Sequence, residues 1–254
     1  MPIPSRPLLL GHRGARASRR LGIRGLRVPA ENTIAAFDYA MTNGCDGFEF
    51  DVRYTRDGRH VLCHDRNYDG RELAATDYPN LADRHGDNLP CLTDILNRFA
   101  ATAYLDIELK VSGNEEAVAA ALRANPPHRG YIVSSFLAEV LARVHEIDPS
   151  LPLGYICKDP EEAKRWTELP IFAFIPHHSL VSQLLVDEVH ARDLQLFTWT
   201  VNQSTKLLRL ASWGVDGLIS DDPKLLAETF LPHWPRDPDK NPKSRSLVDL
   251  KVSS

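Results

Sequence analysis

Two pairs of charged side chains in this sequence are spaced so that each pair would share one face of a β-strand. Glu49 and Asp51 stand two residues apart in one short apolar segment, and Glu108 and Lys110 do so in another. Residues two apart on a β-strand point to the same face, so the carboxylates are expected to share one side of a sheet. Buried carboxylates are costly without a partner, and oxygen ligands favour a hard cation over zinc. The pattern therefore predicts one divalent cation, Mg²⁺ or Ca²⁺, held by Glu49, Asp51 and Glu108.

Two histidines stand directly after short apolar segments. His12 follows residues 7–11, and His64 follows residues 60–63. An imidazole can both take and give a proton near neutral pH. Two of them beside a metal suit displacement at phosphorus, one acting on the nucleophile and one on the leaving group. The alternative for each is a structural histidine with a satisfied hydrogen bond.

Cationic and aromatic side chains accompany this set. Arg13 and Lys110 suit the binding of phosphate oxygens, Arg13 through a bidentate fork and Lys110 as a point charge. The alternative is that both bases pair with the carboxylates in an ion-pair network. Phe136 and Trp199 are candidates for the wall of an alcohol-binding pocket, since aromatic faces suit a choline cation. Core packing is the equally weighted alternative for both rings.

An alternation of apolar segments and helical patterns must position these residues. The pattern predicts eight strand–helix units. The strands are expected at 7–11, 47–53, 104–110, 131–135, 153–157, 171–175, 195–201 and 217–220. The helices are expected at 31–43, 92–99, 114–124, 137–147, 161–166, 180–192, 204–212 and 223–230.

Eight such units favour a closed TIM (β/α)8 barrel, in which catalytic groups lie at the C-terminal ends of the strands. An open doubly wound sheet is the alternative, but it is expected to carry an early GxGxxG turn, which the sequence lacks. We expect a catalytic barrel over residues 1–231, with a short insertion at about 54–91 between the second strand and its helix. A polar tail is expected over 232–254.

Composition limits the remaining possibilities. The chain has 254 residues, the size of one barrel, and its net charge of −4 comes from interspersed charges that give no basic nucleic-acid-binding face. The start lacks signal-peptide features, and no apolar run approaches the ~20 residues that span a bilayer. Four cysteines without a CxxC pair favour a reduced, cytoplasmic setting, although an even number leaves a disulfide open. The arginine-rich segment 13–27 is expected to be a solvated loop, with contact to an anionic headgroup as the alternative.

Nine short motifs, taken in order, resemble the signature of the glycerophosphodiester phosphodiesterase family. They are GHRG (11–14), ENT (31–33), EFDV (49–52), TRDG (55–58), VLCHD (61–65), LPCL (89–92), DIELK (106–110), WTVN (199–202) and SDDP (220–223). The resemblance implies a TIM barrel with a divalent cation. It also implies hydrolysis of glycerophosphodiesters to glycerol 3-phosphate and an alcohol such as choline or ethanolamine. The partner is then a small-molecule substrate, with no nucleic acid and no stable membrane insertion, and the oligomeric state stays open.

The resemblance also implies roles for single residues. Glu49, Asp51 and Glu108 match the family's metal ligands, and His12 and His64 match its acid–base pair. By the same carry-over, Arg13 and Lys110 would contact the phosphate. Glu31 and Asn32 would support Arg13 and the site, with Glu31 near the metal. The sequence departs from the family beside this motif, because Ala30 stands where the family usually has proline and Pro29 comes one place earlier.

Several alternatives remain open at this stage. Family members are thought to start with attack by a hydroxyl of the substrate's own glycerol, and the residues do not separate that route from direct attack by water. A lysophospholipase D-type hydrolase and a catalytically silent ligand-binding barrel are the alternative functions. Asp221 and Asp222, which precede Pro223, are expected to cap the last helix.

Overall fold

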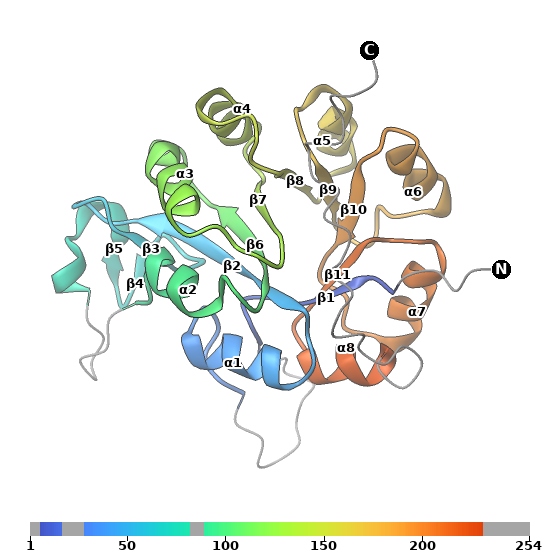
Figure 1. Ribbon diagram of the computed structural model, residues 1–254, viewed down its shortest axis with the longest axis horizontal. Coiled ribbons are helices and arrows are strands. Elements are labelled where there is room, and N and C mark those ends of the chain that lie inside the picture. Colours follow the sequence, from blue (N-terminus) through green and yellow to red (C-terminus); the bar gives the residue numbers. More distant parts are fainter. Residues whose placement is uncertain (1–5, 17–27, 82–88, 231–254) are drawn as a thin grey trace.

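Eight parallel strands close into a barrel in the part of the chain that the structure describes, residues 6–16, 28–81 and 89–230 of a computed structural model (Figure 1). Around the barrel the strands are β1 (Leu8–Gly11), β2 (Gly47–Tyr54), β6 (Tyr104–Leu109), β7 (Tyr131–Ser135), β8 (Leu153–Cys157), β9 (Ala173–Pro176), β10 (Gln195–Thr198) and β11 (Gly217–Ser220). The sheet closes because β1 pairs in parallel with both β2 and β11. The predicted TIM barrel is thus confirmed, and the alternative of an open sheet is wrong.

Helices form the outer layer of the barrel, as Figure 1 shows. They are α1 (Ile34–Thr42), α2 (Leu92–Phe99), α3 (Glu115–Ala124), α4 (Ala138–Ile147), α5 (Pro160–Ala163), α6 (Gln183–His190), α7 (Ser204–Ser212) and α8 (Pro223–Phe230). The first helix begins later than predicted because the Thr33 hydroxyl accepts a hydrogen bond from the Ala36 amide and caps it. The fifth is shorter than predicted, since α5 passes into the 3₁₀ helix η3 (Lys164–Glu168).

The alternation of side chains along β2 separates the core from the site. Phe48 and Phe50 point outward and are fully buried against the helices. The Phe48 ring stacks on Phe37 of α1 at 4.2 Å between centroids and meets Phe99 of α2 edge-on at 5.0 Å. Such aromatic packing contributes beyond the buried area alone. Because side chains alternate along a strand, Glu49, which lies between Phe48 and Phe50, faces the barrel interior, as predicted.

Aromatic rings fill the barrel interior below the site, and glycines on neighbouring strands leave room for a ring in one case and for the backbone in another. Tyr104 and Phe197 stack across the barrel with centroids 6.0 Å apart. A Cβ on Gly217 would lie 2.0 Å from the Phe197 ring, and one on Gly47 would lie 1.8 Å from the Tyr104 carbonyl oxygen. The barrel is therefore closed below the site by packed side chains rather than open as a channel.

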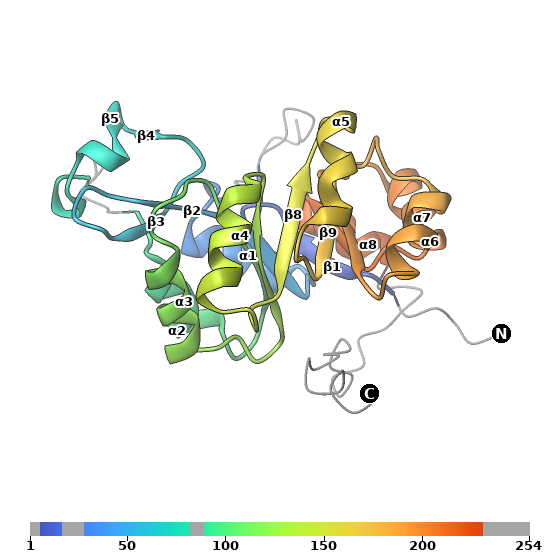
Figure 2. The same cartoon turned by 90° about the horizontal axis from the view of Figure 1, so that it is seen from above.

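The insertion after β2 forms a small unit beside the barrel (Figure 2). Its strand β3 (His60–Leu62) pairs antiparallel with β2 and returns the chain toward the barrel mouth. Then come β4 (Asn67–Tyr68), β5 (Arg71–Glu72), η1 (Leu73–Ala75) and η2 (Tyr78–Asn80). A separate apolar cluster holds this unit together: Val61, Leu73, Leu81, Leu89 and Cys91.

Parts of three predicted segments lie outside the described residues. They are 17–27 of the arginine-rich segment, 82–88 of the insertion, and the tail from 231 to the end. No disulfide joins the four cysteines, all of which are described. Among the described residues, no helix combines the length and the apolar character that crossing a bilayer requires.

Candidate active site

The carboxylates of Glu49, Asp51 and Glu108 meet at the C-terminal ends of β2 and β6. The parallel register pairs Asp51 directly with Glu108, and Glu49 with Asp106. One oxygen from each of the three lies within 4.8 Å of the others, and the three residues are buried. Side-chain alternation and strand register together therefore produce the predicted cluster.

Two bases neutralise this cluster only in part. The Lys110 ammonium lies 2.6 Å from Glu108 Oε1 and 3.4 Å from Asp51 Oδ1, and Arg13 Nε lies 3.1 Å from Asp51 Oδ2. The ion-pair network considered from the sequence is thus present. Even so, Glu49 Oε1 and Asp51 Oδ1 accept no hydrogen bond from any described residue. Buried acceptors are rarely left this way, and such oxygens suit a hard divalent cation.

The electrostatics of the three carboxylates also fit an added positive charge. Burial raises the pKa of Glu49 well above its ordinary value, and the charges of Asp51 and Glu108 act in the same direction. Burial, followed by the charge of Asp51, raises the pKa of Glu108 to about 7. Burial also acts on Asp51, but Arg13 and Lys110 outweigh it, so the pKa of Asp51 is lowered. Two of the three acids are therefore poorly stabilised as anions by protein groups alone.

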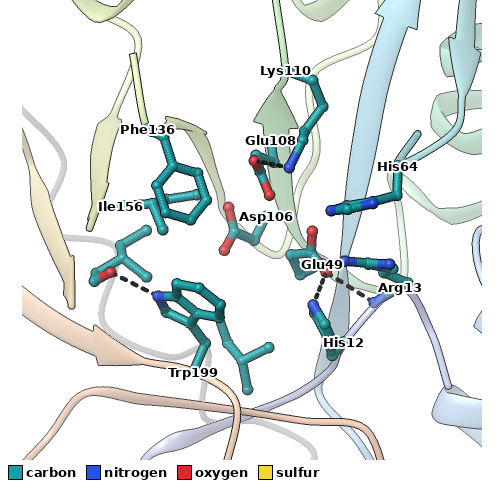
Figure 3. Close-up of a pocket in the computed structure, with 12 residues that line it drawn as sticks. His12, Arg13, Glu49, His64, Asp106, Glu108, Lys110, Phe136, Ile156 and Trp199 are labelled. Atoms are coloured by element: carbon teal, nitrogen blue, oxygen red, sulfur yellow. Dashed lines mark hydrogen bonds and ion pairs between the residues drawn. The ribbon is translucent and has the colours of Figure 1, made fainter. Parts of the chain in front are cut away.

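The two histidines reach the cluster from different elements. His12 is the first residue after β1, and its Nε2 lies 3.8 Å from Glu49 Oε2. His64 follows β3, where the β2–β3 hairpin brings the chain back, as the bond from the Cys63 amide to the Asp51 carbonyl shows. Burial lowers the pKa of His64, although its hydrogen bond with Asp65 opposes this. Both rings line the pocket in Figure 3, so the structure brings the predicted pair together.

Glu31 and Asn32 lie behind the site in a turn before α1. Asn32 makes two hydrogen bonds with Asp51. The Asn32 side-chain nitrogen donates to Asp51 Oδ2 at 2.8 Å, and the Asp51 backbone amide donates to the Asn32 side-chain oxygen at 3.2 Å. Glu31 pairs with Arg13 at 2.6 Å and with Arg16 at 2.7 Å, and it is not part of the three-carboxylate cluster. Asn32 thus orients Asp51, while Glu31 orients Arg13.

Apolar side chains form the opposite side of the pocket. Figure 3 shows Phe136, Ile156 and Trp199 facing the charged groups across the cavity. The Phe136 and Trp199 rings meet edge-on at 5.5 Å, and the Trp199 indole donates a hydrogen bond to the Ile175 carbonyl at 3.1 Å. Both rings also pack against the inner apolar cluster of the barrel. The sequence left pocket lining and core packing as alternatives for Phe136 and Trp199, and in the structure both rings do both.

Two acidic residues have positions that the sequence analysis missed. Asp106, which was given no role, is buried and lines the pocket two residues before Glu108 on the same strand face. Alternation along that strand was the signal that could have found it. Asp221 and Asp222 were both expected to cap α8, which is confirmed for Asp222 and wrong for Asp221. Asp222 caps it by accepting a hydrogen bond from the Leu225 amide at 3.0 Å, whereas Asp221 Oδ1 lies 2.6 Å from His12 Nδ1.

Comparison with known proteins gives a consistent result. Residues 12–225 match the model of the glycerophosphoryl diester phosphodiesterase family. A glycerophosphodiester phosphodiesterase of Caldanaerobacter subterraneus subsp. tengcongensis is 29% identical over 219 residues, covering 77% of this chain and 90% of that protein. One of Bacillus subtilis is 27% identical over 261 residues, covering 87% of this chain and 86% of its own length.

Solved structures share the fold. A glycerophosphodiester phosphodiesterase from Agrobacterium tumefaciens superposes with a TM-score of 0.73 at 23% identity, covering 88% of this chain and 98% of that one. An Oleispira antarctica phosphodiesterase, solved in complex with the product sn-glycerol-3-phosphate, also has a TM-score of 0.73 at 23% identity, with 88% and 96% covered.

Proposed function

The chain belongs to the glycerophosphoryl diester phosphodiesterase family, and from this premise we propose that it hydrolyses glycerophosphodiesters to sn-glycerol 3-phosphate and an alcohol with one divalent cation. The predicted family and enzyme class are confirmed by the family match and the curated relatives. One observation carries the proposal for the mechanism: a single pocket is lined by carboxylates, two histidines and two bases. The Oleispira antarctica phosphodiesterase bound to sn-glycerol-3-phosphate supports the proposed product.

Glu49, Asp51 and Glu108 are the residues that would hold the cation, either Mg²⁺ or Ca²⁺. The oxygens of Glu49 and Asp51 that lack a hydrogen-bond donor, and the raised pKa of Glu49 under burial, support this assignment. When bound, a divalent cation stabilises the negative charge that develops on phosphoryl oxygens.

The protein's own cationic groups would bind and orient the phosphate. Arg13 and Lys110 lie beside the cluster with their charged groups largely buried, so water screens them little. Lys110 also lies 5.5 Å from the centre of the Phe136 ring, which places it between the charged and the apolar side of the pocket. The substrate's phosphate would thus lie at the junction, with its organic part against Phe136 and Trp199.

His12 and His64 would carry the protons. The lowered pKa of His64, due mainly to burial, keeps its imidazole neutral and able to accept a proton near pH 7. One histidine would take the proton of the attacking oxygen, and the other would give a proton to the oxygen of the departing alcohol. The attacking oxygen is either a hydroxyl of the substrate or a water molecule, and detection of a cyclic phosphate would distinguish them.

A lysophospholipase D-type activity is the second candidate, and the apolar side of the pocket is the observation that favours it. A silent barrel is disfavoured because no predicted metal ligand or catalytic histidine is missing. Glu49, Asp51 and Glu108 form one cluster, and His12 and His64 line the pocket beside it. The alcohol group, the cytoplasmic setting, the absence of a nucleic-acid partner, and the division into residues 1–231 and a tail over 232–254 stay predictions.

The test is release of sn-glycerol 3-phosphate from glycerophosphocholine by the full chain, with and without EDTA. We expect EDTA and His12→Ala each to abolish release. His190→Ala is the matched control, since His190 pairs with Asp216 away from the pocket and should leave release intact. Faster turnover of a lysophospholipid would favour the second candidate. Absence of release from several glycerophosphodiesters with Mg²⁺, Ca²⁺ or Mn²⁺ would refute the proposal.

A further inference from the structure

Closure of the barrel brings His12 and Asp221 together although 209 residues separate them in the chain. Strand β1 pairs with β11 so that Gly11 faces Ser220, and the residue after each strand therefore lies beside the other. The His12 amide also donates to the Ser220 carbonyl at 2.8 Å. The contact of 2.6 Å between His12 Nδ1 and Asp221 Oδ1 is thus fixed by the register of the barrel seam.

The carboxylate of Asp221 is held on both of its oxygens. Its Oδ2 accepts a hydrogen bond from the Asn202 side-chain amide at 2.6 Å, which leaves Oδ1 for His12. The Asn202 oxygen in turn accepts from the Asp221 backbone amide at 3.0 Å and from the Ser220 hydroxyl at 2.9 Å. Burial raises the pKa of Asp221, but the bonds with His12 and Asn202 outweigh it and the pKa is lowered. Asp221 is therefore an ionised group that only accepts hydrogen bonds.

An acceptor at this position determines which nitrogen of His12 carries hydrogen. Nδ1 must be the donor to Asp221, so in the neutral ring Nε2 has the free lone pair. Nε2 is the nitrogen that faces Glu49 and the pocket, as Figure 3 shows. We propose that Asp221, held by Asn202, is a positioning residue that fixes the Nδ1–H tautomer of His12 and directs Nε2 at the substrate. This inference rests on the proposed role of His12 in proton transfer.

The contact of Asp221 with His12 is distinct from helix capping, which its neighbour Asp222 performs. Asp222 supplies the cap of α8 through the Leu225 amide, so Asp221 is not needed to start the helix. The second histidine lacks a comparable partner, because the Asp65 side chain that contacts His64 is 80% exposed. Exposed pairs contribute little. The structure thus gives one of the two histidines a fixed orientation and leaves the other adjustable.

Asp221→Asn is the decisive substitution because Asn202 forces the orientation of the new amide. The Asn202 nitrogen needs an acceptor, so the oxygen of the new side chain turns to Asn202 and its NH₂ turns to His12 Nδ1. The ring must then hold its hydrogen on Nε2, with no lone pair toward the pocket. The same exchange in the Ser-His-Asp triad lowers kcat by about 10⁴ through the wrong tautomer.

The test combines a spectrum with kinetics on the full chain. Protein carrying ¹⁵N-labelled histidine is studied by long-range proton–nitrogen NMR at alkaline pH, with and without Mg²⁺, and the His12 signals are those missing from His12→Ala. We expect Nδ1–H in wild type and Nε2–H in Asp221→Asn. The kcat for glycerophosphocholine should fall by about 100-fold or more, with KM within about threefold. Asp222→Asn, which keeps a capping side chain, should match wild type in both measurements.

A second variant keeps the inference testable if Asp221→Asn does not fold. Asn202→Ala keeps the Asp221 carboxylate but removes the hydrogen bond that orients it, so the tautomer should persist while kcat falls by less than in Asp221→Asn. Nε2–H in wild type would overturn the inference, as would Asp221→Asn with unchanged tautomer or with a kcat within about threefold of wild type. If wild type hydrolyses no glycerophosphodiester, the proposed function fails, and the spectra still decide whether Asp221 fixes the His12 tautomer.

Discussion

Replacing Asp106 with asparagine should stabilise the metal-free protein above neutral pH. Asp106 is fully buried on β6, where its Oδ1 accepts a hydrogen bond from the Ser134 hydroxyl at 2.5 Å. Its Oδ2 has no donor among the described residues. Burial raises the pKa of Asp106 to about 7, the bond from Ser134 opposes this, and the charge of Asp51 adds to it. Asparagine has the same shape, can still accept from Ser134 and carries no charge.

The magnitude follows from the difference in pKa between the two states. The unfolded chain has an aspartate pKa of about 3.9, so the folded value is about three units higher. As the pH rises, the unfolded state loses this proton first, and the free energy of unfolding falls between about pH 4 and pH 7. At about 1.4 kcal/mol per unit, the full loss is about 4 kcal/mol. An unpartnered amide in the variant costs about 1–3 kcal/mol, which leaves a net gain of about 1–3 kcal/mol at high pH.

The assay is urea unfolding in EDTA across this pH range, followed by circular dichroism. The difference in free energy of unfolding between Asp106→Asn and wild type should grow by about 4 kcal/mol from about pH 4 to about pH 8. Asp69→Asn is the control, because Asp69 is exposed and its positive φ of 47° suits asparagine. If the difference in free energy of unfolding between Asp106→Asn and wild type stays constant with pH, as expected for the control, the raised pKa of the buried Asp106 carboxyl is refuted.

Three further changes test the site and the barrel. Mg²⁺ at 100 times its Kd should stabilise wild type by about 2.7 kcal/mol and leave the melting temperature of Glu49→Gln almost unchanged. Thermal unfolding with titrated Mg²⁺ measures this, and an equal rise in melting temperature in both proteins would argue against Glu49 as a ligand. Gly47→Ala should yield no folded protein by circular dichroism, because its Cβ would lie 1.8 Å from the Tyr104 carbonyl oxygen. Trp199→Ala should lower stability by about 3 kcal/mol and raise KM for glycerophosphocholine, whereas Trp199→Phe should retain most of both; unchanged KM in Trp199→Ala would remove this ring from the substrate pocket.

Most of the fold could be predicted from the sequence because local patterns decide its elements. The helices at 92–99, 204–212 and 223–230 and the strands at 131–135, 153–157 and 217–220 have the predicted bounds. One error arose where a single hydrogen bond sets the start of a helix. The hydroxyl of Thr33 ends the turn before α1, and periodicity carries no sign of that bond.

The site was predictable where its residues share a strand face or follow the C-terminal end of a strand, and less so where a role depends on one particular contact between two strands. Alternation alone put Glu49 and Asp51 on one face, since the two share β2. A contact such as that between His12 and Asp221 depends on how the first and last strands pair when the barrel closes, and no pattern within either strand gives that pairing. This is why Asp221 was expected to cap a helix, although the pairing of β1 with β11 sets it against His12. The cap and the partner of His12 are neighbours in sequence, and only the closed barrel separates their roles.

Buried charge links the fold to the proposed chemistry. Four carboxylates, those of Glu49, Asp51, Asp106 and Glu108, are buried at the barrel mouth. Among the described residues, Lys110 and Arg13 are the lysine and arginine side chains that form ion pairs with the three that form the cluster. Burial without full compensation destabilises the folded state, so a bound cation would stabilise the barrel as well as the anionic substrate. The gain from Asp106→Asn should therefore shrink when Mg²⁺ is present, because the added charge would ease the ionisation of Asp106.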